Sequence, residues 1–249
     1  MYPILFKIGS LNFYSHGVFI VLGMAIGIAI TAFVSRKKGL AGSFLFGNII
    51  YTLLAGIIGA RISYFILYPD QFNSIMQIFL IWEGGLISYG GFLFGGLAFL
   101  ILLLIEKQPV LDWFDSLALG FPIGLLFGRL GDVLAGDYSN AEKFVNFSSI
   151  SNGFPLPFYE AILCLFIFLA VLAVFLSDKK NKPGFIFLLT LLLYSGGRFI
   201  IDFWRDESKI FLNLSTGQLF SLIIILISFT ATILLLKVRK EGDNNELNS

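Results

Sequence analysis

The sequence predicts an all-α integral membrane protein that crosses the bilayer seven times. Of its 249 residues, 57% are hydrophobic and only 13% are charged, whereas an average soluble domain carries about 25% charged residues. The mean hydropathy is +0.88. A hydrocarbon core about 30 Å thick requires roughly 20 apolar residues per helix, and seven stretches of the chain meet that requirement. A soluble fold is excluded by this composition.

The seven spans follow one another with short connections. They are expected at residues 16–35, 44–68, 86–105, 113–135, 156–177, 184–204 and 216–236. The first apolar run begins near Gly17 and continues for a full span, so no cleavable signal peptide is expected. The second, fourth and sixth spans each contain one arginine. Residues 1–240 are predicted to form a single polytopic membrane domain, and the polar residues 241–249 a disordered cytoplasmic tail.

Lysine and arginine are distributed unequally between the two sets of connecting segments, and this asymmetry predicts the orientation. Ten lie in one set: Arg36, Lys37, Lys38, Lys107, Lys179, Lys180, Lys182, Lys237, Arg239 and Lys240. Four lie in the other set: Lys7, Lys143, Arg205 and Lys209. The first set is therefore expected in the cytoplasm, with the N-terminus outside and the C-terminus inside.

Composition also excludes several kinds of function. The net charge of +1 gives no bulk field that would attract nucleic acid. The single cysteine, Cys164, excludes a disulfide framework and a cysteine-based metal cage. With His16 as the one histidine, a zinc site would need to consist almost wholly of carboxylates. A metal site is therefore not expected.

Arg61, Arg129 and Arg198 lie inside predicted spans, and each follows a glycine closely. A guanidinium at the bilayer centre costs about 2.5–3.5 kcal/mol on insertion scales, so it requires a partner. Asp132 follows Arg129 by three positions and Asp202 follows Arg198 by four, which places each pair on one helix face. Two interpretations stay open: intrahelical ion pairs, or a cationic pocket whose planar guanidinium groups bind phosphate.

Other polar residues lie at the ends of the spans. Glu160 opens the fifth span and is a candidate partner for Arg61. His16 precedes the first span, where it is either a cap or packing residue or a general base, since its unperturbed pKa is close to neutral. Tyr89 begins the third span and is either an interfacial aromatic residue or part of a site. Asp137 follows Arg129 by eight positions.

Several of these residues belong to motifs that occur in a fixed order along the chain. The motifs are Gly59-Ala60-Arg61 with Tyr64, Trp82-Glu83-Gly84-Gly85 with Gly90-Gly91, Gly128-Arg129-Leu130-Gly131 with Gly136, Tyr159-Glu160-Ala161, Tyr194 with Gly197-Arg198-Phe199, Asp202-Phe203 and Arg205, and Ser215-Thr216-Gly217-Gln218. In these motifs and their order, which cover nearly the whole chain, the sequence resembles the prolipoprotein diacylglyceryl transferases.

The resemblance implies a reaction and a set of partners. Members of this family move a diacylglyceryl group from phosphatidylglycerol to the lipobox cysteine of a prolipoprotein, which yields a thioether and glycerol phosphate without a metal or cofactor. By this resemblance the chain is expected in a bacterial inner membrane as a monomer, with its active site towards the outer face. Its partners would be phosphatidylglycerol and the prolipoprotein signal peptide.

The resemblance also implies roles for individual residues. Arg129 and Arg198 would hold the phosphate, and either His16 or Tyr89 would assist deprotonation of the thiol. The remaining candidates are catalytic Asp132, Asp137 and Asp202, of which the last two would orient the arginines, and substrate-binding Arg61, Glu83 and Glu160.

Several positions depart from the family pattern. Tyr89 stands where the family has histidine, and His16 stands where it has tyrosine. Asp132 replaces an asparagine, and Asp137 and Asp202 replace glutamates. One hypothesis is that His16 supplies the base that Tyr89 cannot. The alternative is divergence to a non-catalytic phospholipid-binding protein or a transferase with another acceptor. A small transporter is a weaker alternative, because the chain shows no internal repeat.

Overall fold

In the part of the chain that it describes, the computed structural model contains seven helices that are long and apolar enough to cross a membrane, as the sequence predicts. It describes residues 2–9, 11–72, 74–80, 84–136, 156–177, 182–205, 209–211 and 213–247. The helices are α1 (Ser15–Lys37), α2 (Gly42–Leu67), α3 (Ser88–Ile105), α4 (Val110–Ala135), α5 (Leu156–Leu176), α6 (Phe185–Ile201) and α7 (Thr216–Leu247). Short 3₁₀ turns η1 (Pro69–Gln71), η2 (Ile75–Phe79) and η5 (Asp202–Trp204) lie between them. The orientation in the membrane remains a prediction.

The chain forms two compact units, which are described separately. The first comprises residues 1–34 and 114–249, and the second comprises residues 35–113. The single membrane domain expected from the sequence remains a prediction.

In the first unit, α1 packs against α4 through facing glycines. A Cβ atom added to Gly27 would lie 2.9 Å from the carbonyl oxygen of Gly120, and one added to Gly124 would lie 3.4 Å from that of Gly23. Each helix thus contributes two glycines spaced four residues apart, the small-xxx-small pattern that brings membrane helices into backbone contact. Apolar side chains complete the packing: Val34, Ala118, Leu119, Ile167, Val171 and Ile186 form one buried cluster.

Two polar contacts fix α6 against α4. Asp115 is buried and accepts hydrogen bonds from the backbone nitrogens of Gly184 and Phe187, each at 2.9 Å, so its carboxylate caps the start of α6. Pro122, inside α4, has no N–H to offer the carbonyl of Ala118 one turn earlier. The hydroxyl of Thr190 on α6 lies 3.5 Å from that carbonyl oxygen.

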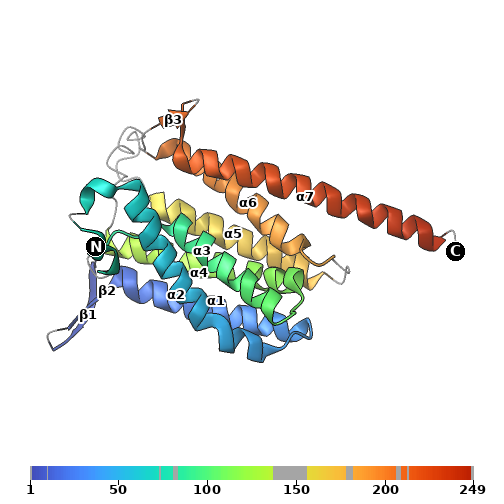
Figure 1. Cartoon of the computed structure of the whole chain (residues 1–249), viewed down its shortest axis with the longest axis horizontal. Helices are drawn as coiled ribbons and strands as arrows, with labels where there is room; N and C mark the ends of the chain where they lie inside the picture. Colours follow the sequence, from blue (N-terminus) through green and yellow to red (C-terminus); the bar gives the residue numbers. More distant parts are fainter. Residues whose placement is uncertain are drawn as a thin grey trace. The chain divides into compact units, whose positions relative to one another are not determined.

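The N-terminal segment is hydrogen-bonded both to the first turn of α1 and to the end of α4. Strands β1 (Ile4–Ile8) and β2 (Leu11–Tyr14) form an antiparallel hairpin, which is not among the elements predicted from the sequence. Figure 1 shows it at the start of α1. The backbone nitrogen of Tyr2 donates to the carbonyl of Leu134 at 2.8 Å, and that of Ser15 donates to Pro3 at 3.0 Å. These bonds join the N-terminal segment to the end of α4.

The last helix begins at a capping box. The backbone nitrogen of Gln218 donates to Ser215 Oγ at 3.2 Å, and that of Ser215 donates to Gln218 Oε1 at 3.0 Å, so two donors at the helix start are satisfied reciprocally. A second hairpin, β3 (Lys209–Phe211) with β4 (Leu214–Ser215), leads into it. The helix continues to Leu247, so residues 241–247, for which the sequence predicts disorder, are helical here.

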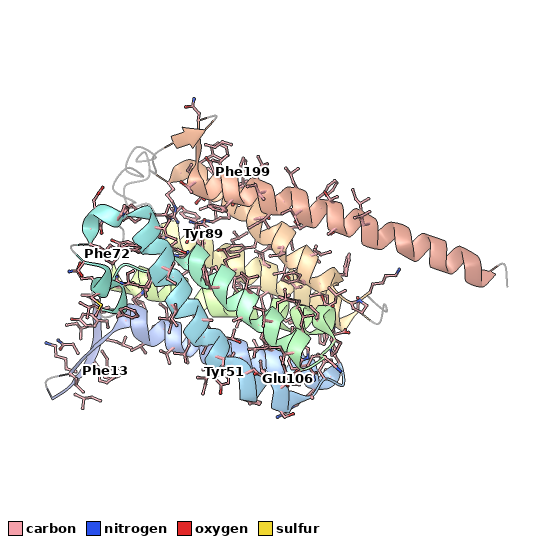
Figure 2. The ribbon with its side chains drawn as sticks, in the orientation of Figure 1. Phe13, Tyr51, Phe72, Tyr89, Glu106 and Phe199 are labelled. Carbon is pink, nitrogen blue, oxygen red and sulfur yellow. The ribbon has the colours of Figure 1, made fainter. Side chains whose placement is uncertain are left out.

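In the second unit, α2 and α3 pack through another glycine contact. A Cβ atom on Gly56 would lie 3.3 Å from the carbonyl oxygen of Gly91. Asn48 of α2 donates to Glu106 Oε1 at 2.7 Å, and Figure 2 shows Glu106 and Tyr89 at opposite ends of α3. Side chains on the outside of the helices are apolar and exposed, such as Tyr51 at 63%, which suits contact with lipid rather than water.

Candidate active site

Three arginines of the first unit converge on one buried carboxylate, that of Glu160 in the first turn of α5. Arg129 of α4 forms an ion pair with it, with Nε 2.7 Å from Oε2. Arg205, just after η5, contacts Oε1 through Nη2 at 2.5 Å, and Arg198 of α6 contacts the same oxygen through Nη1. The end of α4, the start of α5 and the end of α6 therefore meet at Glu160.

The ion pairs predicted from sequence spacing are present beside this carboxylate. Arg129 Nη1 lies 3.0 Å from Asp132 Oδ2, and Arg198 Nε lies 3.1 Å from Asp202 Oδ1. Arg205 Nε lies 3.3 Å from the same Asp202 oxygen. Both intrahelical pairs are thus present, and two of the three arginines for which the sequence offered a phosphate-binding pocket as the alternative, Arg129 and Arg198, also meet at Glu160. Binding of phosphate by these arginines remains a prediction. Arg205, which the sequence places in a connecting segment, also belongs to this cluster, and its spacing of three positions from Asp202 is a helical one.

The cluster continues to the first turn of α1. His16 Nδ1 lies 2.5 Å from Asp132 Oδ1. The carboxylate of Asp132 therefore bridges an imidazole and a guanidinium, one through each oxygen. His16, Arg129, Asp132, Glu160, Arg198 and Asp202 were all predicted as site residues, and the structure brings these six together.

Formal charge is balanced in this cluster, which is composed of Arg129, Arg198 and Arg205 with Asp132, Glu160 and Asp202. Exposure increases across it. The side chains of Asp202 and Glu160 are 0% and 4% exposed, that of Arg129 is 28% exposed and that of His16 is 51% exposed. The buried carboxylates hold the arginines in place, so a ligand would meet Arg129 and His16 first.

Arg61 has a different environment in the second unit. It donates from Nη2 to the carbonyl of Gln77 at 2.7 Å, from Nε to that of Ile78 at 3.2 Å, and from Nη1 to those of Gly84 and Gly85. Both glycines have positive φ, 83° and 72°, a backbone conformation that favours glycine. The guanidinium therefore connects α2, through main-chain oxygens, with η2 and with the segment at residues 84–85.

This arrangement borders a small cavity of about 100 Å³, lined by Arg61, Tyr64, Gln71, Phe72, Gln77, Gly84 and Gly85. The guanidinium carbon of Arg61 lies 4.9 Å from the ring centroid of Phe72, within the range of a cation–π interaction. Phe72 is labelled in Figure 2. The substrate-binding role predicted for Arg61 remains a prediction.

The other candidates are placed as follows. Tyr89 lies in the first turn of α3, in the second unit, and is 38% exposed. Glu83 and Asp137 lie outside the described residues. Among the residues that the structure describes, no group of three or more His, Cys, Asp or Glu side chains is placed to hold a metal ion.

Comparison with known proteins decides the family. Residues 3–234 match the sequence model of the prolipoprotein diacylglyceryl transferases. The chain belongs to this family. Among its relatives is the phosphatidylglycerol–prolipoprotein diacylglyceryl transferase of Clostridium botulinum (strain Langeland), 29% identical over 92% of this chain and 94% of the relative. That of Clostridium kluyveri is 30% identical over 92% and 95%. Transferase 1 of Clostridium perfringens (strain 13) is 27% identical over 97% of both chains.

Proposed function

We propose that this protein transfers the diacylglyceryl group of phosphatidylglycerol to the lipobox cysteine of a prolipoprotein in a bacterial inner membrane. Family membership supports the reaction, and the names of the relatives give the same donor and acceptor class. The seven apolar helices suit a multi-pass location. We place the active site at the outer face because the basic connecting segments favour a cytoplasmic location for the opposite ends of the helices.

The chemistry consists of one displacement. The cysteine sulfur attacks the diacylglyceryl carbon that bears the phosphate, so a C–S bond forms while the C–O bond breaks. The electron pair of the broken bond stays on the phosphate oxygen, and glycerol phosphate leaves. The thiol proton passes to a base, either His16 or Tyr89, because the thiolate is the effective nucleophile.

The main structural support for this proposal is the convergence of Arg129, Arg198 and Arg205 on Glu160. A guanidinium has five N–H donors, and the contacts of Arg129 with Glu160 and Asp132 use its Nε and Nη1 nitrogens. Since Glu160 fixes the three arginines before the lipid arrives, their donors are oriented for the charge that develops on the phosphate.

A transfer assay tests the proposal. Purified protein in micelles that contain phosphatidylglycerol is mixed with a lipobox peptide, and the products are followed by mass. A diacylglyceryl adduct on the cysteine peptide, with none on a matched Cys→Ser peptide, is expected. Arg129→Ala and Arg198→Ala should abolish the adduct while the folded protein stays in the membrane. Full activity in both variants would contradict the assigned roles.

A second candidate is a phospholipid-binding protein of the same family without catalysis. The balance of charge in the cluster favours it, because the three arginines already have carboxylate partners. This candidate predicts that phosphatidylglycerol co-purifies with the protein while no peptide is modified. The same assay separates the two functions.

A further inference from the structure

The structure joins a histidine to a carboxylate at the exposed edge of the charged cluster. His16 Nδ1 and Asp132 Oδ1 are 2.5 Å apart, and Asp132 Oδ2 accepts from Arg129 Nη1 at 3.0 Å. A carboxylate bound to one ring nitrogen fixes both the orientation of the imidazole and its tautomer, and leaves proton exchange to the other nitrogen. Asp132 is in turn held by Arg129, so the imidazole is oriented by a group that is itself fixed.

The backbone around His16 is also fixed. A Cβ atom on Gly131 of α4 would lie 3.2 Å from His16 Cα and 3.3 Å from its carbonyl oxygen. The helices therefore approach closely at this point, and only glycine at 131 leaves room for it. The preceding residue, Ser15, is buried and bonded to the N-terminal segment through its backbone nitrogen and its hydroxyl. His16 thus projects from an anchored helix start.

His16 and Asp132 differ in how far their side chains are exposed. The side chain of His16 is 51% exposed, whereas that of Asp132 is 11% exposed. A thiol that arrives from outside the cluster would therefore meet the imidazole and not the carboxylate. This division fits a base that touches the substrate and a positioning residue that acts through it.

We propose that His16 is the base of the transfer reaction and that Asp132 is its positioning residue. This inference rests on the proposed function. His16 Nε2 takes the proton from the thiol, the sulfur forms its bond to the diacylglyceryl carbon, and the C–O bond to phosphate breaks. The imidazolium, stabilised by Asp132, then returns the proton to glycerol phosphate or to water. No other reactant is needed.

The competing role for Asp132 is to hold Arg129 for phosphate binding, and a double-mutant cycle distinguishes the two. Transfer to the cysteine peptide is measured for wild type, His16→Gln, Asp132→Asn and the double variant. His16→Gln should lower kcat by about 100-fold or more, with little change in KM for phosphatidylglycerol. Asp132→Asn should lower kcat at least about tenfold, and the double variant should match His16→Gln, because residues that act as a unit are not additive. Independent, multiplicative losses would overturn the proposal.

A second readout isolates deprotonation. A lipobox peptide with selenocysteine in place of cysteine carries a selenol that is already ionised at neutral pH, so it needs no base. We expect His16→Gln and Asp132→Asn to transfer lipid to this peptide within a few-fold of wild type. A similarly large loss with both peptides would overturn the proposal, since it would indicate a structural defect. Asp112→Asn, which removes the partner of Lys38 at 3.1 Å, is the matched control and should retain wild-type transfer.

The two hypotheses fail differently. A wild-type protein that modifies neither peptide would refute the proposed function, and the base assignment with it. A wild-type protein that is active, together with an equally active His16→Gln variant, would refute only the base assignment.

Discussion

Neutralising Glu160 is the most direct test of the charged cluster. In Glu160→Gln, the side chain that three guanidinium groups contact loses its charge, and the carboxylates of Asp132 and Asp202 remain to balance three arginines. Removing one member of a buried ion pair costs about 3–5 kcal/mol. For a chain of about this size each kcal/mol lowers Tm by roughly 2–4 °C, which gives a decrease of about 6–20 °C.

The assay is thermal unfolding in a neutral detergent, with all variants heated at one rate because membrane-protein unfolding is often irreversible. Asp112→Asn is the control, since its partly exposed pair with Lys38 is expected to contribute about 1 kcal/mol or less. Phosphatidylglycerol should raise the Tm of Glu160→Gln more than that of wild type, because the net negative charge of its head group offsets the lost carboxylate. Phosphatidylcholine, whose phosphate is neutralised by its own choline, should not. A Tm for Glu160→Gln equal to that of the control would refute the reasoning.

Three further predictions concern activity and packing. Arg198→Lys keeps the charge but loses the planar fork, so transfer should fall about 10²- to 10³-fold in the peptide assay; wild-type rates would contradict its role at the phosphate. Gly27→Ala places a methyl group 2.9 Å from a carbonyl oxygen of α4 and should destabilise the protein by about 1–3 kcal/mol in thermal unfolding. Gly96→Ala, whose Cβ would meet nothing within 4 Å, is its control, and equal Tm values would argue against close α1–α4 contact. If His16 and Tyr89 have exchanged roles, Tyr89→His should restore part of the transfer lost in His16→Tyr, and no recovery would count against the exchange.

Much of the fold could be predicted from composition, because a span requires only a long apolar run and each helix satisfies its own backbone groups. All seven helices lie close to the predicted ranges. The N-terminal hairpin could not be predicted in this way. The residues of β1, from Ile4 to Ile8, are mostly apolar and show no clean alternation, and their pairing with β2 depends on a turn at Gly9, where φ is 59°.

The candidate site was predictable only where it is local. Spacing along one helix indicated the pairs Arg129–Asp132 and Arg198–Asp202, both of which the structure contains. The convergence on Glu160 joins three helix ends that are far apart in sequence, and no helical period connects them.

The hydrogen-bond partners of Arg61 could not be predicted from the sequence, for a different reason. Its partners are main-chain carbonyls, and every residue carries such a group, so the sequence gives no sign of which ones are used. Glu160, the acidic partner expected for Arg61 from the sequence, contacts other arginines in the structure.

The contact between His16 and Asp132 joins positions 116 residues apart. At about 5–20 residues per second, a ribosome needs roughly 6–23 s to make the intervening chain. During this time His16 of α1 is present in the nascent chain without its carboxylate partner Asp132. Glu160, Arg198 and Arg205 are synthesised later still. A polypeptide that ends before Arg198 would contain the imidazole but lack two of the three guanidinium groups. The charged cluster around Glu160 can therefore form only after most of the chain, up to Arg205, has been synthesised.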